Sequence, residues 1–141
     1  MKFILSLLVL LSANVLFAQN NTPPPPPVAD TASIIFIKAE VEASVDRQEW
    51  IDHLTKNLQS PIEKAAKKGM KAGTYTVQVK FLVEKDGSIS DVQALNDPGF
   101  GLALAAVKAL KTGPKWNAGE QNGKKVRSYH TQPITFVIQE K

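Results

Sequence analysis

The strictest constraint in this sequence is an alternating stretch that ends in a tight turn. Apolar side chains occupy every second position of residues 75–83: Tyr75, Val77, Val79, Phe81 and Val83. This alternation predicts a half-buried strand. The dipeptide Asp86-Gly87 follows, and it is preferred in two-residue hairpin turns because both central positions need a positive φ. We therefore expect residues 88–95 to return as an antiparallel strand.

Two stretches before this hairpin predict helices. The first, over residues 47–58, opens on Asp46 and Glu49, which have the spacing of a capping box. The second opens on Ser60, with Pro61 in the first helical position and Glu63 three residues after the cap. Residues 33–43, "SIIFIKAEVEA", come before both helices. They predict a strand, because they are rich in β-branched and aromatic residues.

The part of the chain after the hairpin predicts a further helix. Asp97 is the expected cap and Pro98 the first helical residue, while Gly113 and Pro114 end the helix. Its expected buried stripe consists of Phe100, Ala103, Leu104, Val107 and Leu110.

The last part predicts a loop and a final strand. Residues 117–125 form the expected loop, with a turn at Asn122-Gly123. Residues 126–138 form the expected strand. Pro133 lacks a backbone donor, so this strand should lie at an edge or contain a bulge.

This order of elements predicts an α+β fold. The simplest packing is a small antiparallel three-stranded sheet, which the N-terminal strand could join, with the helices packed on one face. Trp116 falls between the last helix and the last strand, where a large side chain would fill the end of the core. The alternative is an aromatic residue displayed for binding. We expect a structural role for four aromatic residues: Trp50, Trp116, Phe81 and Phe136.

The N-terminus predicts export. Residues 1–18 have one lysine, a short apolar run and a small final residue, which is the form of a secretory signal peptide; an uncleaved signal anchor is the alternative. Residues 19–33 contain five consecutive prolines and predict a stiff linker. Residues 34–141 form the expected domain, which we place in the periplasm, with or without an inner-membrane anchor.

The sequence contains no pattern typical of an enzyme, a metal site or a cofactor site. It has no cysteine, and neither His53 nor His130 has a second ligand at metal-binding spacing. Motifs for activated nucleophiles or phosphate loops are absent. The formal net charge is only +4 and no dense basic run occurs, so we expect no nucleic-acid partner.

Residues 50–139 resemble the C-terminal domain of TonB-type energy transducers, in the form common in Bacteroidetes. Three stretches carry the resemblance in order and spacing: "LTKNLQSPIEKAAKKGMKAG", "VQVKFLVEKDGSISDVQAL" and "ALKTGPKWNAGEQNGKKVRSYHTQPITFVI". The resemblance implies a periplasmic module of transmembrane transport that binds the TonB box of outer-membrane receptors by adding a strand to its sheet. It also implies ExbB/ExbD-like partners if the chain is membrane-anchored.

The resemblance places the partner on the final strand. An open sheet edge offers unpaired backbone groups that an extended peptide can satisfy. We expect the contact to concentrate on Arg127, Ser128, Tyr129, His130, Thr131 and Gln132. Gln59 and Ser60 match a second contact corner of the family, where Ser60 replaces a tyrosine. The alternative function is a secreted structural or interaction protein that uses this fold without energy transduction.

Overall fold

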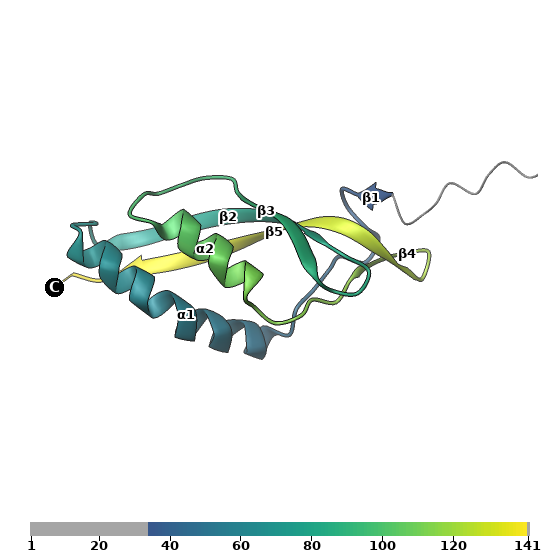
Figure 1. The fold of residues 1–141 in the computed structure, drawn as a ribbon, viewed down its shortest axis with the longest axis horizontal. Coiled ribbons are helices and arrows are strands. Elements are labelled where there is room, and N and C mark those ends of the chain that lie inside the picture. The colour runs from purple at the N-terminus through teal and green to yellow at the C-terminus, as the bar shows by residue number, and fades with distance from the viewer. Residues whose placement is uncertain (1–33, 141) are drawn as a thin grey trace, which may run out of the picture.

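A long antiparallel pair of strands, β2 (Gly73–Val83) and β5 (Lys124–Ile138), forms the centre of the fold (Figure 1). The structure is a computed structural model that describes residues 34–140. The expected signal peptide and proline-rich linker lie outside the described residues. The remaining elements are β1 (Ile35–Phe36), α1 (Arg47–Lys67), β3 (Ile89–Ala94), α2 (Leu102–Lys111) and β4 (Gly119–Gln121). The predicted α+β class is confirmed.

The sheet has the strand order β1-β5-β2-β3. β2 and β5 pair without a break from Gly73 opposite Ile138 to Val83 opposite Ser128. β3 pairs with the other edge of β2 in antiparallel orientation. β1 instead runs parallel to β5, so the sheet is mixed rather than purely antiparallel as predicted.

Two short elements differ from the predicted strands. β4 lies in the predicted loop and pairs with the first residues of β5. The turn between them is the predicted one, with a φ of 51° at Asn122 and 73° at Gly123. The predicted N-terminal strand is reduced to the two residues of β1, because the chain bends at residues 37–38. Further on, Val41 and Ser44 form isolated bridges with Glu120 and Asn117.

The β2–β3 turn is longer than predicted. The Glu84 N–H donates to the Ser88 carbonyl at 2.8 Å, which leaves three residues in the loop rather than two. Only Gly87, with a φ of 84°, has the left-handed conformation, and Asp86 does not. Asp86 instead accepts hydrogen bonds from the backbone and the hydroxyl of Ser88, a local turn that replaces the expected type I′ geometry.

α1 is one helix, and the prediction of two helices divided at Ser60 is wrong. The N-cap at Asp46 is confirmed, since its carboxylate accepts from the Glu49 N–H at 2.9 Å. Pro61 lies inside the helix. A single buried stripe spans the proline: Trp50, Leu58 and Ala65. Packing of this stripe against the sheet outweighs the cost of an interior proline, which is about 3 kcal/mol.

α2 begins later than the sequence predicts. The carboxylate of Asp97 accepts from the Gly99 N–H at 2.8 Å and closes a local turn instead of capping a helix. Positive φ angles at Gly99, Phe100 and Gly101 keep this segment out of helical geometry. The predicted stripe is therefore partly wrong, because Leu104 is 74% exposed. The buried residues of α2 are Leu102, Ala106, Ala109 and Leu110.

The core lies between the two helices and one face of the sheet (Figure 1). Trp116 is 4% exposed and lies where α2 leads back to the sheet. Its ring is 4.9 Å from Phe81, 5.1 Å from His130 and 6.1 Å from Trp50, measured between centroids. Its indole nitrogen is buried without a hydrogen-bond partner. The side chain is thus held by packing alone.

An ion pair joins the end of β2 to the start of β5. The Arg127 Nε donates to Glu84 Oε2 at 2.6 Å, and a second guanidinium nitrogen donates to Oε1 at 3.1 Å. Ser90 donates to the same carboxylate at 2.9 Å. The hydrogen bonds from Arg127 hold the pKa of Glu84 below its usual range, against the opposing effect of burial.

Replacing Trp116 by alanine should destabilise the domain by about 3–5 kcal/mol, because a buried aromatic ring is lost from the core. Chemical denaturation followed by circular dichroism would measure this effect. Leu104→Ala on exposed α2 surface is the matched control and should leave the midpoint almost unchanged. Equal midpoints for the Trp116 variant and the natural protein would show that Trp116 does not hold the core together.

Glu84→Gln should lower stability at neutral pH and have little effect in acid. Folding lowers the pKa of Glu84, so its contribution is fully present above the unfolded carboxyl pKa of about 4.3 and is lost as the pH falls through the folded value. Urea midpoints at pH 7 and pH 3 would measure this difference. Glu63→Gln, which removes an exposed carboxylate bonded only to Gln59 among the described residues, is the control. A deficit that stays constant with pH would contradict the assignment.

Candidate functional site

Most of β5 has an open side. Downstream of Ser128, β5 pairs with β2 on one side and with no described strand on the other. Gln78 of β2 donates its N–H to Asn96 Oδ1 at 2.7 Å and accepts at its carbonyl from Leu95 at 2.8 Å. Its backbone groups therefore face β3. Pro133 is the register partner of Gln78, so this is a non-hydrogen-bonded pair and the backbone of Pro133 faces the open side.

Hydrogen-bonded and non-hydrogen-bonded pairs alternate along an antiparallel ladder, so the orientation of Pro133 fixes that of every other paired residue of β5. The residues whose backbone groups face the open side are Tyr129, Thr131, Pro133, Thr135 and Val137. The even-numbered residues bond to β2 instead. Of the two positions Ser128 and Thr131, only Thr131 thus offers its N–H to an added strand.

Pro133 divides this open edge into two sections. It has no N–H to offer, and its carbonyl accepts from the side-chain amide of Gln132 at 3.2 Å. We define the upper section as Tyr129 and Thr131, and the lower section as Thr135 and Val137. An added strand can find backbone donors in either section but not between them.

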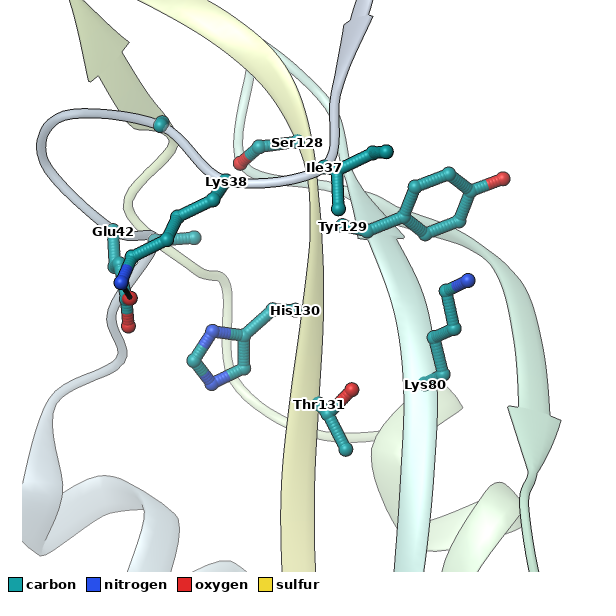
Figure 2. A pocket seen from close by; sticks show the side chains of 10 residues that line it. Ile37, Lys38, Glu42, Lys80, Ser128, Tyr129, His130 and Thr131 are labelled. Carbon is teal, nitrogen blue, oxygen red and sulfur yellow. Dashed lines mark ion pairs between the residues drawn. The ribbon is translucent and has the colours of Figure 1, made fainter.

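A groove borders the upper section (Figure 2). One wall comes from the segment that follows β1, where Ile37 is 89% exposed and Lys38 forms an ion pair with Glu42 at 3.7 Å. The other wall comes from β5 and its neighbour β2: Lys80, Ser128, Tyr129, His130 and Thr131. The groove therefore offers apolar side chains, of which Ile37 is the most exposed, together with charges of both signs and two aromatic rings, next to backbone groups that face away from β2.

Tyr129 is held in place by its neighbours on the uncovered face of the sheet. Its hydroxyl donates to Asp91 Oδ2 at 2.8 Å, and this hydrogen bond raises the pKa of Tyr129. The Lys80 ammonium lies 4.4 Å from the centre of the ring. His130 points the other way, toward Phe81 and Trp116.

A second groove borders the lower section. It is lined by Thr135 of β5 and by one side of α1: Leu54, Thr55, Leu58, Gln59, Ile62 and Glu63. Leu54 and Ile62 are only partly buried there. A strand added along Thr135 could cover them with an apolar side chain.

The structure separates the site residues that the sequence predicted. Tyr129 to Gln132 lie at or next to the upper section, whereas Arg127 and Ser128 are already beside β1. Gln59 lies by the lower section. Ser60 lines a groove between α1 and α2, together with Lys64 and Lys108, and does not reach β5.

Sequence reasoning missed Ile37, Thr135 and Val137. Ile37 belongs to a segment distant in sequence, so only the fold brings it to the edge. Thr135 and Val137 could have been found from the sequence. Pro133 has no backbone donor, which favours a place where its backbone faces the open side, and residues two and four positions further along a strand face the same side.

No group of three histidine, aspartate or glutamate side chains within residues 34–140 could hold a metal ion. The ring of His53 is instead used structurally, with Nε2 at 2.7 Å from the Ala109 carbonyl. Neither α1 nor α2 is long and apolar enough to cross a membrane.

Comparison with known proteins gives one match. No curated protein and no solved structure matches the chain. The family model described as the C-terminal of Gram-negative bacterial TonB protein matches residues 63–138, from the C-terminal end of α1 to the end of β5. This region is more than half of the chain and contains the hairpin, α2 and the open edge of β5. The chain therefore belongs to the TonB C-terminal domain family.

Proposed function

We propose that this protein is a periplasmic binding module of TonB-dependent transport that takes up an extended segment of an outer-membrane receptor along β5. The family is a non-enzymatic one associated with transport, and its domains interact with envelope proteins such as outer-membrane receptors. Residues 1–18 would direct export, and residues 19–33 would act as the linker.

The observation that carries the proposal is the open edge of β5. Four residues have an N–H that faces this side, and the two grooves beside it offer places for alternate side chains of an added strand. Strand addition uses this combination, because main-chain hydrogen bonds supply affinity and side-chain pockets supply specificity.

The charges near the edge favour a neutral or acidic segment. Lys124 and Lys125 are exposed at the start of β5, and Lys80 lies beside the upper section. A basic segment would be repelled by these cations, because it has no negative charge to pair with them. Attraction between exposed charges is screened by salt, so the affinity for an acidic segment should fall as ionic strength rises.

Site-specific photo-crosslinking in the cell envelope would identify the partner. A crosslinker placed at Thr131 or Thr135 should capture an N-terminal or other extended segment of a TonB-dependent receptor, identified by mass spectrometry of the linked peptide. The same crosslinker at Asp52, on the outer side of α1, is the control. Linked peptides from structural envelope proteins alone, or equal capture from Asp52, would contradict the proposal and favour a secreted interaction protein without a role in transport.

A matched pair of substitutions at Thr131 tests strand addition itself. Thr131→Pro removes one outward donor, whereas Thr131→Ala removes the side chain and keeps the donor. A lost hydrogen bond of about 1–1.5 kcal/mol predicts an affinity for the captured segment roughly 5- to 10-fold lower in the proline variant than in the alanine variant. Both variants should keep their circular dichroism spectrum, because this N–H does not bond to β2. Equal affinities would mean that β5 does not bind the partner through its backbone.

A further inference from the structure

β1 already occupies the start of the edge that we assign to the partner. Ile35 lies opposite Arg127 and Phe36 opposite Ser128, in parallel orientation. Because even-numbered residues of β5 bond to β2, the backbone groups available to β1 belong to Arg127 and Tyr129. In a parallel ladder a residue bonds to the two residues that flank its register partner. The backbone of Phe36 therefore faces β5, and it reaches the first residue of the upper section.

The contacts of β1 are weak for a strand. Ile34 is 41% exposed and Ile35 is 38% exposed, and neither β1 residue belongs to the hydrophobic core. Ile37, the next residue, is 89% exposed and leaves the edge before reaching Thr131. A two-residue ladder with little apolar burial can open at low cost.

The segment that follows β1 is held much more firmly. Ala39 and Ala43 are 4% and 5% exposed. Val41 and Glu120 exchange two backbone hydrogen bonds of 3.0 and 2.9 Å. Ser44 and Asn117 exchange two more, of 3.1 and 2.6 Å. Residues 34–38 can therefore leave β5 while residues 39–44 stay docked, with the bend at residues 37–38 as the hinge.

We propose that β1 is a built-in competitor for the upper section of the β5 edge. This inference rests on the proposed function and adds its regulation: an added strand that uses Tyr129 must displace β1, while a strand confined to the lower section need not. The sequence around β1 fits this role, since residues 33–37, "SIIFI", are rich in the β-branched and aromatic residues that favour strands. Its covalent connection gives it a millimolar effective concentration at the edge.

The chain's own segment serves as the probe. A synthetic peptide with the sequence of residues 31–38, "TASIIFIK", is titrated against the isotope-labelled full chain, and the amide NMR signals of Arg127, Tyr129 and Thr131 are followed. Three forms are compared: the natural chain, Phe36→Pro and Ile35→Pro. Phe36→Pro removes the donor that faces β5. Ile35→Pro places a proline in the same strand at a residue whose backbone faces away from β5, and it is the matched control.

The peptide should bind the Phe36→Pro variant with an affinity about tenfold or more above that of the natural chain, because the apparent affinity scales with the fraction of free edge. The Ile35→Pro control should behave like the natural chain, because it keeps the Phe36 N–H that faces β5. Hydrogen exchange at Arg127 and Tyr129 should speed up in the Phe36→Pro variant alone, even without peptide.

Two outcomes would overturn the inference. Equal peptide affinity in all three forms would show that β1 does not compete, and no binding to a Phe36→Pro variant with unchanged exchange would show that β1 does not pair through Phe36. Neither result depends on the receptor. Receptor cross-links at Thr131 that persist after such a result would leave the proposed function intact and remove only its regulation.

Discussion

The unbroken ladder between β2 and β5 is the constraint on which the rest of this structure depends. Its register decides two things at once. It turns Val77, Val79 and Phe81 of β2, with Ile134 and Phe136 of β5, toward the helices. It also decides which backbone groups of β5 bond to β2 and which remain for another strand. A slip of one residue would expose the core face and also reverse which residues of β5 face the open side, so the packing of the core protects the register of the open edge.

Trp116 connects this ladder to the helices and to the site. The carbonyl of Gly87 accepts from the Trp116 N–H at 3.1 Å, and a side chain at Gly87 would place its Cβ 2.0 Å from the Trp116 carbonyl oxygen. The β2–β3 turn therefore needs glycine both for its positive φ and for this close contact. The indole ring then packs on His130, which lines the upper groove. The groove is thus supported from behind by the aromatic side chains of the core.

The sequence predicts those features that depend on local periodicity and fails where tertiary contacts decide. The alternation in β2 and the Asn122-Gly123 turn are local signals, and both appear as predicted. The division of α1 at Ser60 is also a local signal, but the buried stripe on both sides of Pro61 overrides it. The start of α2 was misplaced because Asp97 can cap a turn as well as a helix. For the proposed site, the family resemblance places the partner on β5, whereas the contacts of β1 and Ile37 depend on a pairing that no local pattern specifies.

An open edge rich in β-branched residues is also a risk, because it can pair with any other exposed strand. This chain limits that risk without closing the edge. β1 covers the start, and Pro133 interrupts the middle, where Gln132 also occupies the carbonyl. With β1 in place, the upper section keeps one outward donor, that of Thr131, and the lower section keeps two, which are too few to hold a strand by backbone bonds alone. In the function that we propose, a partner strand would therefore gain most of its selectivity from side chains placed in the adjoining grooves. The same features that limit non-specific pairing of the edge would then make its binding selective.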